Sequence, residues 1–215
     1  MLEMSSQNTN LRKTSMKILK PFVVELAPTL ASHWYNVWKE KPDSNKGRFI
    51  GCFPSSTTIL NAYPQSAYLT QWIATQGWSE AQRIKSEAGE HGTRIHTATE
   101  ALEDGVELHE QDYSLEEWWK ISAFVDWHNE YKPELIAKEF PVFSPKGKYA
   151  GRLDRIYKIG GDITLLDLKS SSGIHEHFPL QFASYAKAIE ECTDLRIVQT
   201  AALQVGAKNK SGYRF

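Results

Sequence analysis

The feature that most constrains the fold is a change in the spacing of apolar residues near position 134. Before it, apolar residues recur at helical spacing, whereas the segments after it alternate with a period of two, as strands do. These segments span residues 135–143, 148–159 and 162–169. Gly147 and the run Gly160-Gly161-Asp162 supply the turns between them. The sequence therefore predicts three consecutive strands joined by short turns.

Helical stretches are expected on both sides of these strands. They span residues 66–78, 79–105, 114–132 and 176–191. Ser79 and Ser114 are suited to cap the second and third of them. Gly89 and Gly92 would break the second stretch, or let another backbone approach it closely. With a further strand over residues 195–205, this order predicts an α/β domain with a central mixed sheet flanked by helices.

The N-terminal quarter of the chain lacks a comparable pattern. Residues 1–20 are polar, residues 33–40 carry aromatic side chains at mixed spacing, and Pro42 to Gly51 is typical of a loop. We therefore expect residues 1–52 to form a flexible and helical extension. Residues 53–215 should form the rest of what we expect to be a single domain.

Composition excludes several classes of protein. The formal net charge of −1 excludes a histone-like or generally basic nucleic-acid coat protein. Two cysteines exclude a disulfide scaffold, a four-cysteine zinc site and a four-cysteine iron–sulfur cluster. No apolar run approaches the roughly 18 residues that a membrane helix needs, and the N-terminus lacks the apolar core of a secretory signal. We expect a soluble protein without a membrane partner.

The charges are strongly segregated along the chain. Residues 86–139 carry 4 basic and 14 acidic side chains, whereas the segments on either side are net basic. Five basic residues surround the single acid Asp154 within residues 146–158, namely Lys146, Lys148, Arg152, Arg155 and Lys158. Such a cluster fits a solvated hairpin face, and it also fits a surface that neutralises a phosphate backbone.

Two carboxylates and one lysine form the most informative pattern. Asp167 and Lys169 are two residues apart in a strand and therefore share a face, which Asp154 on the neighbouring strand could also reach. Carboxylate oxygens suit Mg²⁺ or Mn²⁺, and a lysine can orient or deprotonate a nucleophilic water. The same residues would also fit an ordinary Asp–Lys pair on a surface hairpin.

Two further pairs share a helix face. His96 and Glu100 are four residues apart, as are Gln181 and Tyr185, which follow the strand that carries Lys169. His96 could be a packed residue or a ligand. Gln181 and Tyr185 could be an amphipathic helix face, or a hydrogen-bonding pair that contacts a phosphate or the lysine.

The order of these elements resembles a known family. The sequence contains, in order, Gly92-x-x-x-His96, Glu139, Gly151-x-x-Asp154, Asp167-x-Lys169 and Gln181-x-x-x-Tyr185. This order resembles the RecB-type branch of the PD-(D/E)XK nuclease superfamily over roughly residues 53–205. The segment from Pro54 to Leu60 is also similar to the one that opens many stand-alone phage and mitochondrial exonucleases of this branch. The resemblance implies a restriction-endonuclease-like αβββαβ core, with residues 53–215 as the nuclease domain.

The resemblance implies a metal site. Asp154 and Asp167 would be the principal ligands of one or two Mg²⁺ or Mn²⁺ ions, and the carbonyl of Leu168 would join them. His96 would be the additional ligand that distinguishes the RecB-like branch. Glu139 would support the site through a water-mediated contact, or be a carboxylate at the sheet edge. The cysteines that bind an iron–sulfur cluster in some relatives are absent, so no such cluster is expected.

The resemblance also implies catalytic and DNA-binding roles. Lys169 would position and activate the attacking water, and Gln181 and Tyr185 would contact DNA or hold the lysine at the edge of the site. The residues expected to contact DNA, from their charge or their hydroxyl groups, are Arg94, Lys146, Lys148, Arg152, Arg155, Ser55, Ser56 and Thr57. The last three fit the cap of a helix equally well.

The resemblance implies a Mg²⁺-dependent DNA exonuclease that acts in recombination, repair or DNA processing. Its alternatives are a structure-specific endonuclease with the same site and a catalytically silent DNA-binding module. The expected partner is DNA, as linear or single-stranded ends, a recombination or repair protein is a further candidate partner, and the oligomeric state stays open. We expect the cytoplasm of a bacterium or of a phage-infected host in preference to a mitochondrion.

Overall fold

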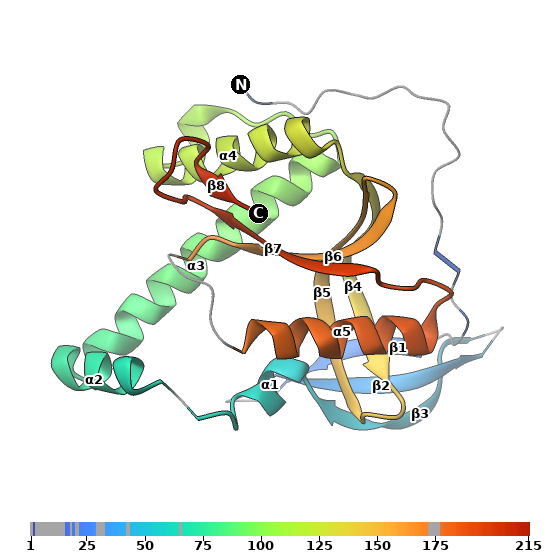
Figure 1. The fold of residues 1–215 in the computed structure, drawn as a ribbon. Coiled ribbons are helices and arrows are strands. Elements are labelled where there is room, and N and C mark those ends of the chain that lie inside the picture. Colours follow the sequence, from blue (N-terminus) through green and yellow to red (C-terminus); the bar gives the residue numbers. More distant parts are fainter. Residues whose placement is uncertain are drawn as a thin grey trace.

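The computed structural model describes residues 2, 16–17, 19, 22–28, 33–41, 44–64, 66–171 and 177–215. A five-stranded mixed sheet forms its centre (Figure 1). Its strands, in spatial order, are β4 (Glu134–Ser144), β5 (Tyr149–Ile159), β6 (Asp162–Lys169), β7 (Gln199–Val205) and β8 (Tyr213–Arg214). Only the β6–β7 pair is parallel among these strands, because helix α5 (Phe178–Cys192) returns the chain to the same edge. The predicted α/β class and mixed sheet are confirmed.

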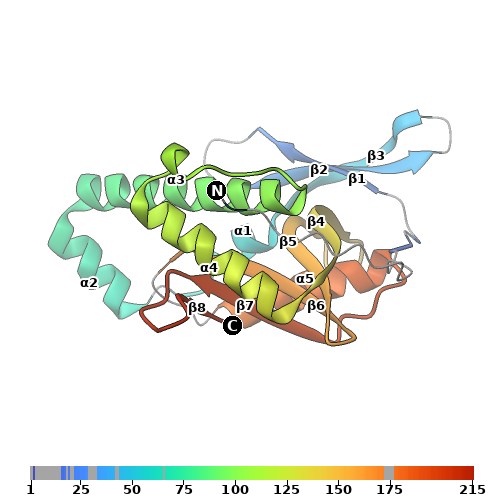
Figure 2. The same ribbon diagram turned by 90° about the horizontal axis from the view of Figure 1, so that it is seen from above.

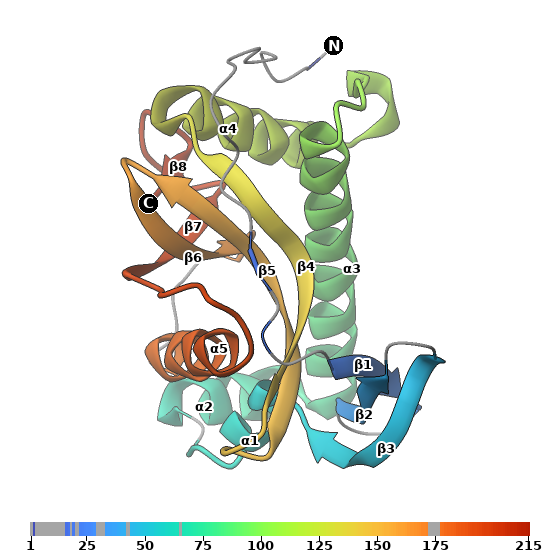
Figure 3. The same ribbon diagram turned by 90° about the vertical axis from the view of Figure 1, so that its right-hand side faces the viewer.

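Helices cover both faces of this sheet. α3 (Trp78–Glu103) and α4 (Leu115–Tyr131) lie on one side of the strands and α5 lies on the other, as Figure 3 shows. The remaining helices are α1 (Ser56–Leu60), α2 (Ala67–Gln76) and a 3₁₀ turn over Glu110–Asp112. Seen from above, α2 and the start of α3 project from one end of the molecule (Figure 2).

The helix termini differ in part from the prediction. The capping box at the start of α4 is confirmed, since Ser114 and Glu117 bond each other's backbone N–H groups. α3 begins one residue before the predicted Ser79 cap, because Gly77 adopts a φ of 81° and turns the chain directly from α2 into α3. Of the two alternatives for Gly89 and Gly92, the break is wrong, and among the described residues a close neighbour is found only at Gly92, where a Cβ would lie 3.2 Å from Ser170 Oγ. The helix is continuous there, since its C-terminal half is anchored on the core and propagation adds a hydrogen bond per residue.

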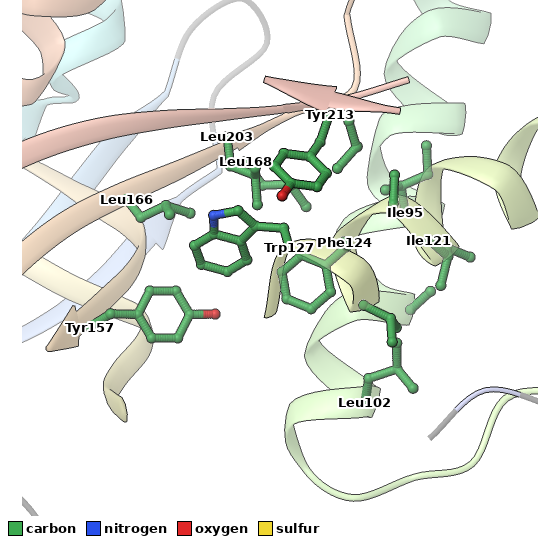
Figure 4. Close-up of a cluster of buried hydrophobic side chains, with 14 of the residues drawn as sticks. Ile95, Leu102, Ile121, Phe124, Trp127, Tyr157, Leu166, Leu168, Leu203 and Tyr213 are labelled. Carbon is green, nitrogen blue, oxygen red and sulfur yellow. The ribbon is translucent and has the colours of Figure 1, made fainter. Parts of the chain in front are cut away.

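Two apolar cores flank the sheet. Trp127 and Phe124 of α4 pack with Tyr157, Leu168 and other buried side chains between the helices and one sheet face (Figure 4). On the opposite face, residues of α5 such as Phe182 pack against β5 and β6. Burial on both faces fixes the register of β5 and β6, which carry the acidic residues considered below.

The N-terminal region contains a second sheet, so the helical extension predicted for residues 1–52 is wrong over the described residues from 22 to 52. Most of residues 1–21, for which we expect a flexible chain, lie outside the described residues. Three antiparallel strands form it, β1 (Phe22–Ala27), β2 (Trp34–Lys41) and β3 (Ser44–Pro54), the last of which occupies the predicted loop. Val37 is buried in this sheet between the intermediate residues Asn36 and Trp38, which is strand periodicity. Trp34 and Trp38 are also apolar and lie on the other face of β2, so this period does not appear as an alternation of apolar and polar residues in the sequence.

The second sheet packs on the turn end of the β4–β5 hairpin. Val24, Tyr35 and Val37 contact Phe143 and Ala150 there. Figure 3 shows the consequence, with β1–β3 lying beside the lower ends of β4 and β5. Among the described residues, no helix is long and apolar enough to cross a membrane.

Candidate metal centre

Three potential metal ligands from three elements meet in one place. His96 of α3, Glu139 of β4 and Asp154 of β5 each offer a ligand atom, and these atoms lie within 4.8 Å of one another. His96 Nδ1 is 3.6 Å from Asp154 Oδ2. His96 Nε2 is 3.1 Å from the carbonyl oxygen of Leu168 on β6. The grouping of His96, Asp154 and Leu168 follows the sequence-based expectation. Glu139 belongs to an edge strand, and its carboxylate also lies within 4.8 Å of the ligand atoms of His96 and Asp154.

The strand register positions the two carboxylates. Lys138 pairs with Arg155 and Phe140 with Leu153, so the intervening Glu139 and Asp154 face each other across β4 and β5. Glu139 has a φ of 45°, in the left-handed region, which costs a side-chain-bearing residue roughly 1–3 kcal/mol. Asp154 Oδ2 accepts a hydrogen bond from the Leu168 backbone N–H at 3.0 Å, which links β5 to β6.

Asp167 and Lys169 share a face of β6, as the period of two predicts. Lys169 Nζ is 2.5 Å from Asp167 Oδ2. The same ammonium lies 4.4 Å from the ring centroid of Phe178, the first residue of α5. Asp167 is buried and Lys169 is partly exposed, so the pair lies at the boundary between the protein interior and the solvent.

The electrostatics of this cluster favour a cation. Burial raises the pKa of Asp167 to about 6, with the nearby Asp154 carboxylate adding to the shift against the lowering effect of Lys169. Burial likewise raises the pKa of Asp154 and of Glu139, and Glu100 contributes to both shifts. Carboxylates that raise one another's pKa values are a strained arrangement that a bound divalent cation relieves.

The tautomer of His96 is consistent with a ligand. Burial and the Arg155 guanidinium lower the pKa of His96, which favours the neutral imidazole at neutral pH. Because the Leu168 carbonyl can only accept, the neutral ring donates from Nε2 and leaves a lone pair on Nδ1 beside Asp154. Two acceptors would then face each other, and a cation between them would satisfy both. An oxygen-rich set with one imidazole fits Mg²⁺ or Mn²⁺.

An open depression of about 480 Å³ leads to this cluster. It is lined by Gly89, Gly92, Thr93, His96, Thr97, Glu100 and Glu139. One wall is therefore α3 and the other is β4. The sequence analysis assigned no role in the site to Glu100, although it places Glu100 on the same helix face as His96.

Gln181 and Tyr185 lie buried beside the acidic cluster. Burial raises the pKa of Tyr185 well above its usual range against a hydrogen bond with Gln181, and Asp154 and Asp167 add to the shift. The ring of Tyr185 approaches Gly151 so closely that a Cβ there would lie 2.7 Å from it. Gly151 is therefore needed to seat Tyr185 at the edge of the site.

The hydroxyl residues before α1 form a helix cap, which was one of two equal expectations. Ser55 is the N-cap, and its Oγ accepts from the Thr58 backbone N–H at 2.8 Å. The Thr57 hydroxyl lies 2.8 Å from the same oxygen. Ser56 is buried and hydrogen-bonds Ser184 of α5. These contacts show the helix cap, while the binding of a terminal phosphate stays a prediction.

The expectation that Arg155 contacts DNA is wrong. Its side chain is fully buried under α3, where Nε lies 2.9 Å from Glu103 Oε2. Its Nη2 donates to Thr99 Oγ1 at 2.8 Å, and the Thr99 hydroxyl bonds the backbone carbonyl of His96. Tyr157 also hydrogen-bonds Glu103. Arg155 therefore links β5, which carries Asp154, to α3, which carries His96. The Glu103 carboxylate compensates the charge of the buried guanidinium.

Arg94 is engaged in a structural contact instead of facing a free groove. Its Nε lies 2.6 Å from Glu117 Oε1, and its Nη2 donates to the Asp112 carbonyl at 3.0 Å. Since Glu117 also completes the capping box with Ser114, Arg94 fixes the start of α4 against α3.

This contact predicts a pH dependence of stability. Burial raises the pKa of Glu117, but hydrogen bonds from Arg94 and Ser114 outweigh it and bring the pKa to about 2 from an ordinary 4.5. The stabilisation is therefore complete above pH 4.5 and is lost as the pH falls towards 2. We expect Glu117→Gln to lower the free energy of unfolding by roughly 2–3 kcal/mol at pH 7 and to flatten this dependence in urea titrations. Equal slopes in both proteins, or an equal effect of Glu116→Gln, would contradict this assignment.

The remaining basic candidates are exposed. Lys146 and Lys148 lie in the β4–β5 turn, which the Lys146 N–H fastens to Glu191 at 3.2 Å. Arg152 lies closest to the acidic cluster, with Nη1 3.7 Å from Glu139 Oε2. Tyr35 of β2 is near enough to Arg152 and Glu139 for both to shift its pKa, which burial raises. Nothing in the sequence indicates this proximity, because it depends on how the N-terminal sheet docks.

Comparison of the chain with protein-family models and with curated proteins finds no match. What this site does is therefore inferred from its own residues.

Proposed function

We propose that this chain is a divalent-metal-dependent DNA exonuclease that hydrolyses phosphodiester bonds in recombination, repair or DNA processing. The observation that carries the proposal is the group of His96, Glu139 and Asp154, with Asp167 near enough to Asp154 and His96 for both to shift its pKa and paired with Lys169. This set provides both an oxygen-rich cation site and a lysine at its edge. We further propose that the chain is a RecB-like member of the PD-(D/E)XK superfamily, since β4, β5, β6, α5 and β7 follow a helix in the order of that core.

The residues fit Mg²⁺ or Mn²⁺ as the bound ion. Asp154 and Asp167 would hold it, together with His96 Nδ1 and Glu139, while the Leu168 carbonyl, expected as a ligand, would instead accept from His96 Nε2 and orient the ring. The ion supplies Lewis-acid stabilisation of the charge that develops on the phosphate oxygens.

The protein groups carry the remaining steps. Lys169 Nζ, held between Asp167 and the Phe178 ring, would donate to the attacking water and orient it toward the phosphorus. The neutral phenol of Tyr185 and the amide of Gln181 would restrict the path of the substrate at the edge of the site. Arg152 would neutralise a phosphate next to the scissile one.

The exposed basic side chains beside the site indicate the surface along which DNA would approach it. Arg152 lies on β5, and Lys146 and Lys148 extend the positive charge toward the hairpin turn. DNA ends would be the partner, and we propose the cytoplasm of a bacterium or phage-infected host as the setting.

The test is a Mg²⁺ titration of the purified protein on end-labelled linear DNA and on covalently closed circles. We expect Mg²⁺-dependent loss of linear DNA only, with a decrease of at least about 100-fold in Asp167→Asn. Cutting of circles would replace the exonuclease by an endonuclease with the same site. Absence of cleavage with both Mg²⁺ and Mn²⁺, or wild-type rates in Asp167→Asn, would refute the proposed active site.

A further inference from the structure

Gly89 is a glycine that neither packing nor backbone geometry requires. It lies inside the continuous helix α3, where glycine is the poorest helix former after proline. A Cβ built on it meets nothing within 4 Å, and its φ is not in the left-handed region. The other helical glycine differs, because a Cβ at Gly92 would lie 3.2 Å from Ser170 Oγ.

The open space next to Gly89 belongs to the metal centre. Gly89 lines the same depression as His96 and Glu139. His96 is seven residues further along α3, so the two positions share a helix face and lie about 10 Å apart along the axis. A side chain at position 89 would therefore project into the approach to the proposed ligands.

The neighbouring side chains on this face of α3 do not fill the depression, and a lysine follows them one turn away. The hydroxyl of Thr93 donates to the Gly89 carbonyl at 3.0 Å, which folds it back on the helix. The exposed Lys85 lies one turn beyond Gly89 on the same face. A depression with an open helix surface along its side, the proposed metal ligands at its end and Lys85 one turn outside its lining suits a polyanionic strand.

We infer that Gly89 is a specificity-determining position, whose missing side chain lets the sugar–phosphate backbone of the scissile strand pass against α3 to the metal residues. Glycine is the residue that permits such a close approach of backbone to ligand. Lys85 would contact a phosphate at the outer end of the path. This inference rests on the proposed nuclease function.

The test uses Gly89→Ala, Gly89→Gln and the control Ala88→Gln, which enlarges an exposed neighbour outside the lining of the depression. Binding of a fluorescent DNA strand is measured with Ca²⁺ in place of Mg²⁺, and cleavage is measured with Mg²⁺. We expect Gly89→Gln to raise both the Kd and the KM for DNA about tenfold, while Ala88→Gln changes neither. Gly89→Ala should weaken binding less and raise the Tm by about 2–4 °C, because alanine favours the helix.

A small diester separates this role from damage to the metal centre. Hydrolysis of bis(p-nitrophenyl) phosphate does not use the path along α3, so its rate should be the same in Gly89→Gln and wild type. Wild-type Kd and KM for DNA in Gly89→Gln would overturn the inference and leave the proposed function standing. Wild-type protein that binds DNA without cleaving it would refute the nuclease and leave the binding comparison decisive for Gly89. Absence of both binding and cleavage would overturn both.

Discussion

Replacement of Lys169 by methionine is expected to lower the rate of DNA cleavage by about 10²–10⁴-fold without weakening the binding of a divalent cation. The ammonium lies 2.5 Å from Asp167 Oδ2, where it competes with a cation for the same carboxylate. Its removal leaves the carboxylates free to bind the ion, yet it removes the group that would orient the attacking water. Rates with labelled linear DNA and Mn²⁺ affinity by electron paramagnetic resonance check the two halves.

Lys169→Arg serves as the matched variant. A guanidinium keeps the positive charge but does not give up a proton at neutral pH. Rescue of cleavage by arginine would assign the lysine to charge stabilisation, and failure of rescue would assign it to proton transfer. Wild-type cleavage in Lys169→Met, or a loss of Mn²⁺ binding, would contradict the role proposed for this residue.

Arg155→Met is expected to lower the free energy of unfolding by about 3–5 kcal/mol. The variant would leave the Glu103 carboxylate, whose side chain is 2% exposed, buried without its cation. It would also free Thr99, whose hydroxyl bonds the His96 carbonyl, so α3 would lose its anchor on β5. Urea unfolding monitored by tryptophan fluorescence measures the effect.

Two matched variants sharpen this result. Arg152→Met changes the exposed arginine three residues away and should cost less than about 1 kcal/mol, while weakening DNA binding. The double variant Arg155→Met/Glu103→Met removes both buried charges and should recover most of the loss. Wild-type stability in Arg155→Met together with weaker DNA binding would restore the surface role expected from the sequence.

Local periodicity and spacing predicted the elements that carry the site. The strands after position 134, the α4 capping box and the shared face of Asp167 and Lys169 depend on neighbours in sequence, so the pattern suffices for them. The proximity of His96, Asp154 and Leu168 was available only through the resemblance, because spacing within one element does not reveal which elements pack together.

The wrong predictions concern residues whose environment depends on contacts with residues far away in the sequence. Arg152 and Arg155 lie three residues apart and so on opposite faces of β5, but the sequence does not show that Arg155 is the covered one, since its burial depends on Glu103 lying 52 residues away. The N-terminal sheet was not predicted because β2 carries apolar side chains on both of its faces, so its sequence lacks the alternation of apolar and polar residues. Ser55 could cap a helix or bind a phosphate by its chemistry alone, and the Thr58 N–H shows the cap without testing the phosphate role.

The distance in sequence between the ligands also determines when the site can exist. His96 and the Leu168 carbonyl are 72 residues apart, and β6 is completed as a central strand only by parallel pairing with β7. Contacts of such long range form after local helices and hairpins, because closing a long loop costs entropy before it is rewarded. A nascent chain that has emerged as far as α4 already contains His96 but none of the carboxylates that would share an ion with it. The proposed activity would therefore be withheld during synthesis until the last third of the chain has been made and folded.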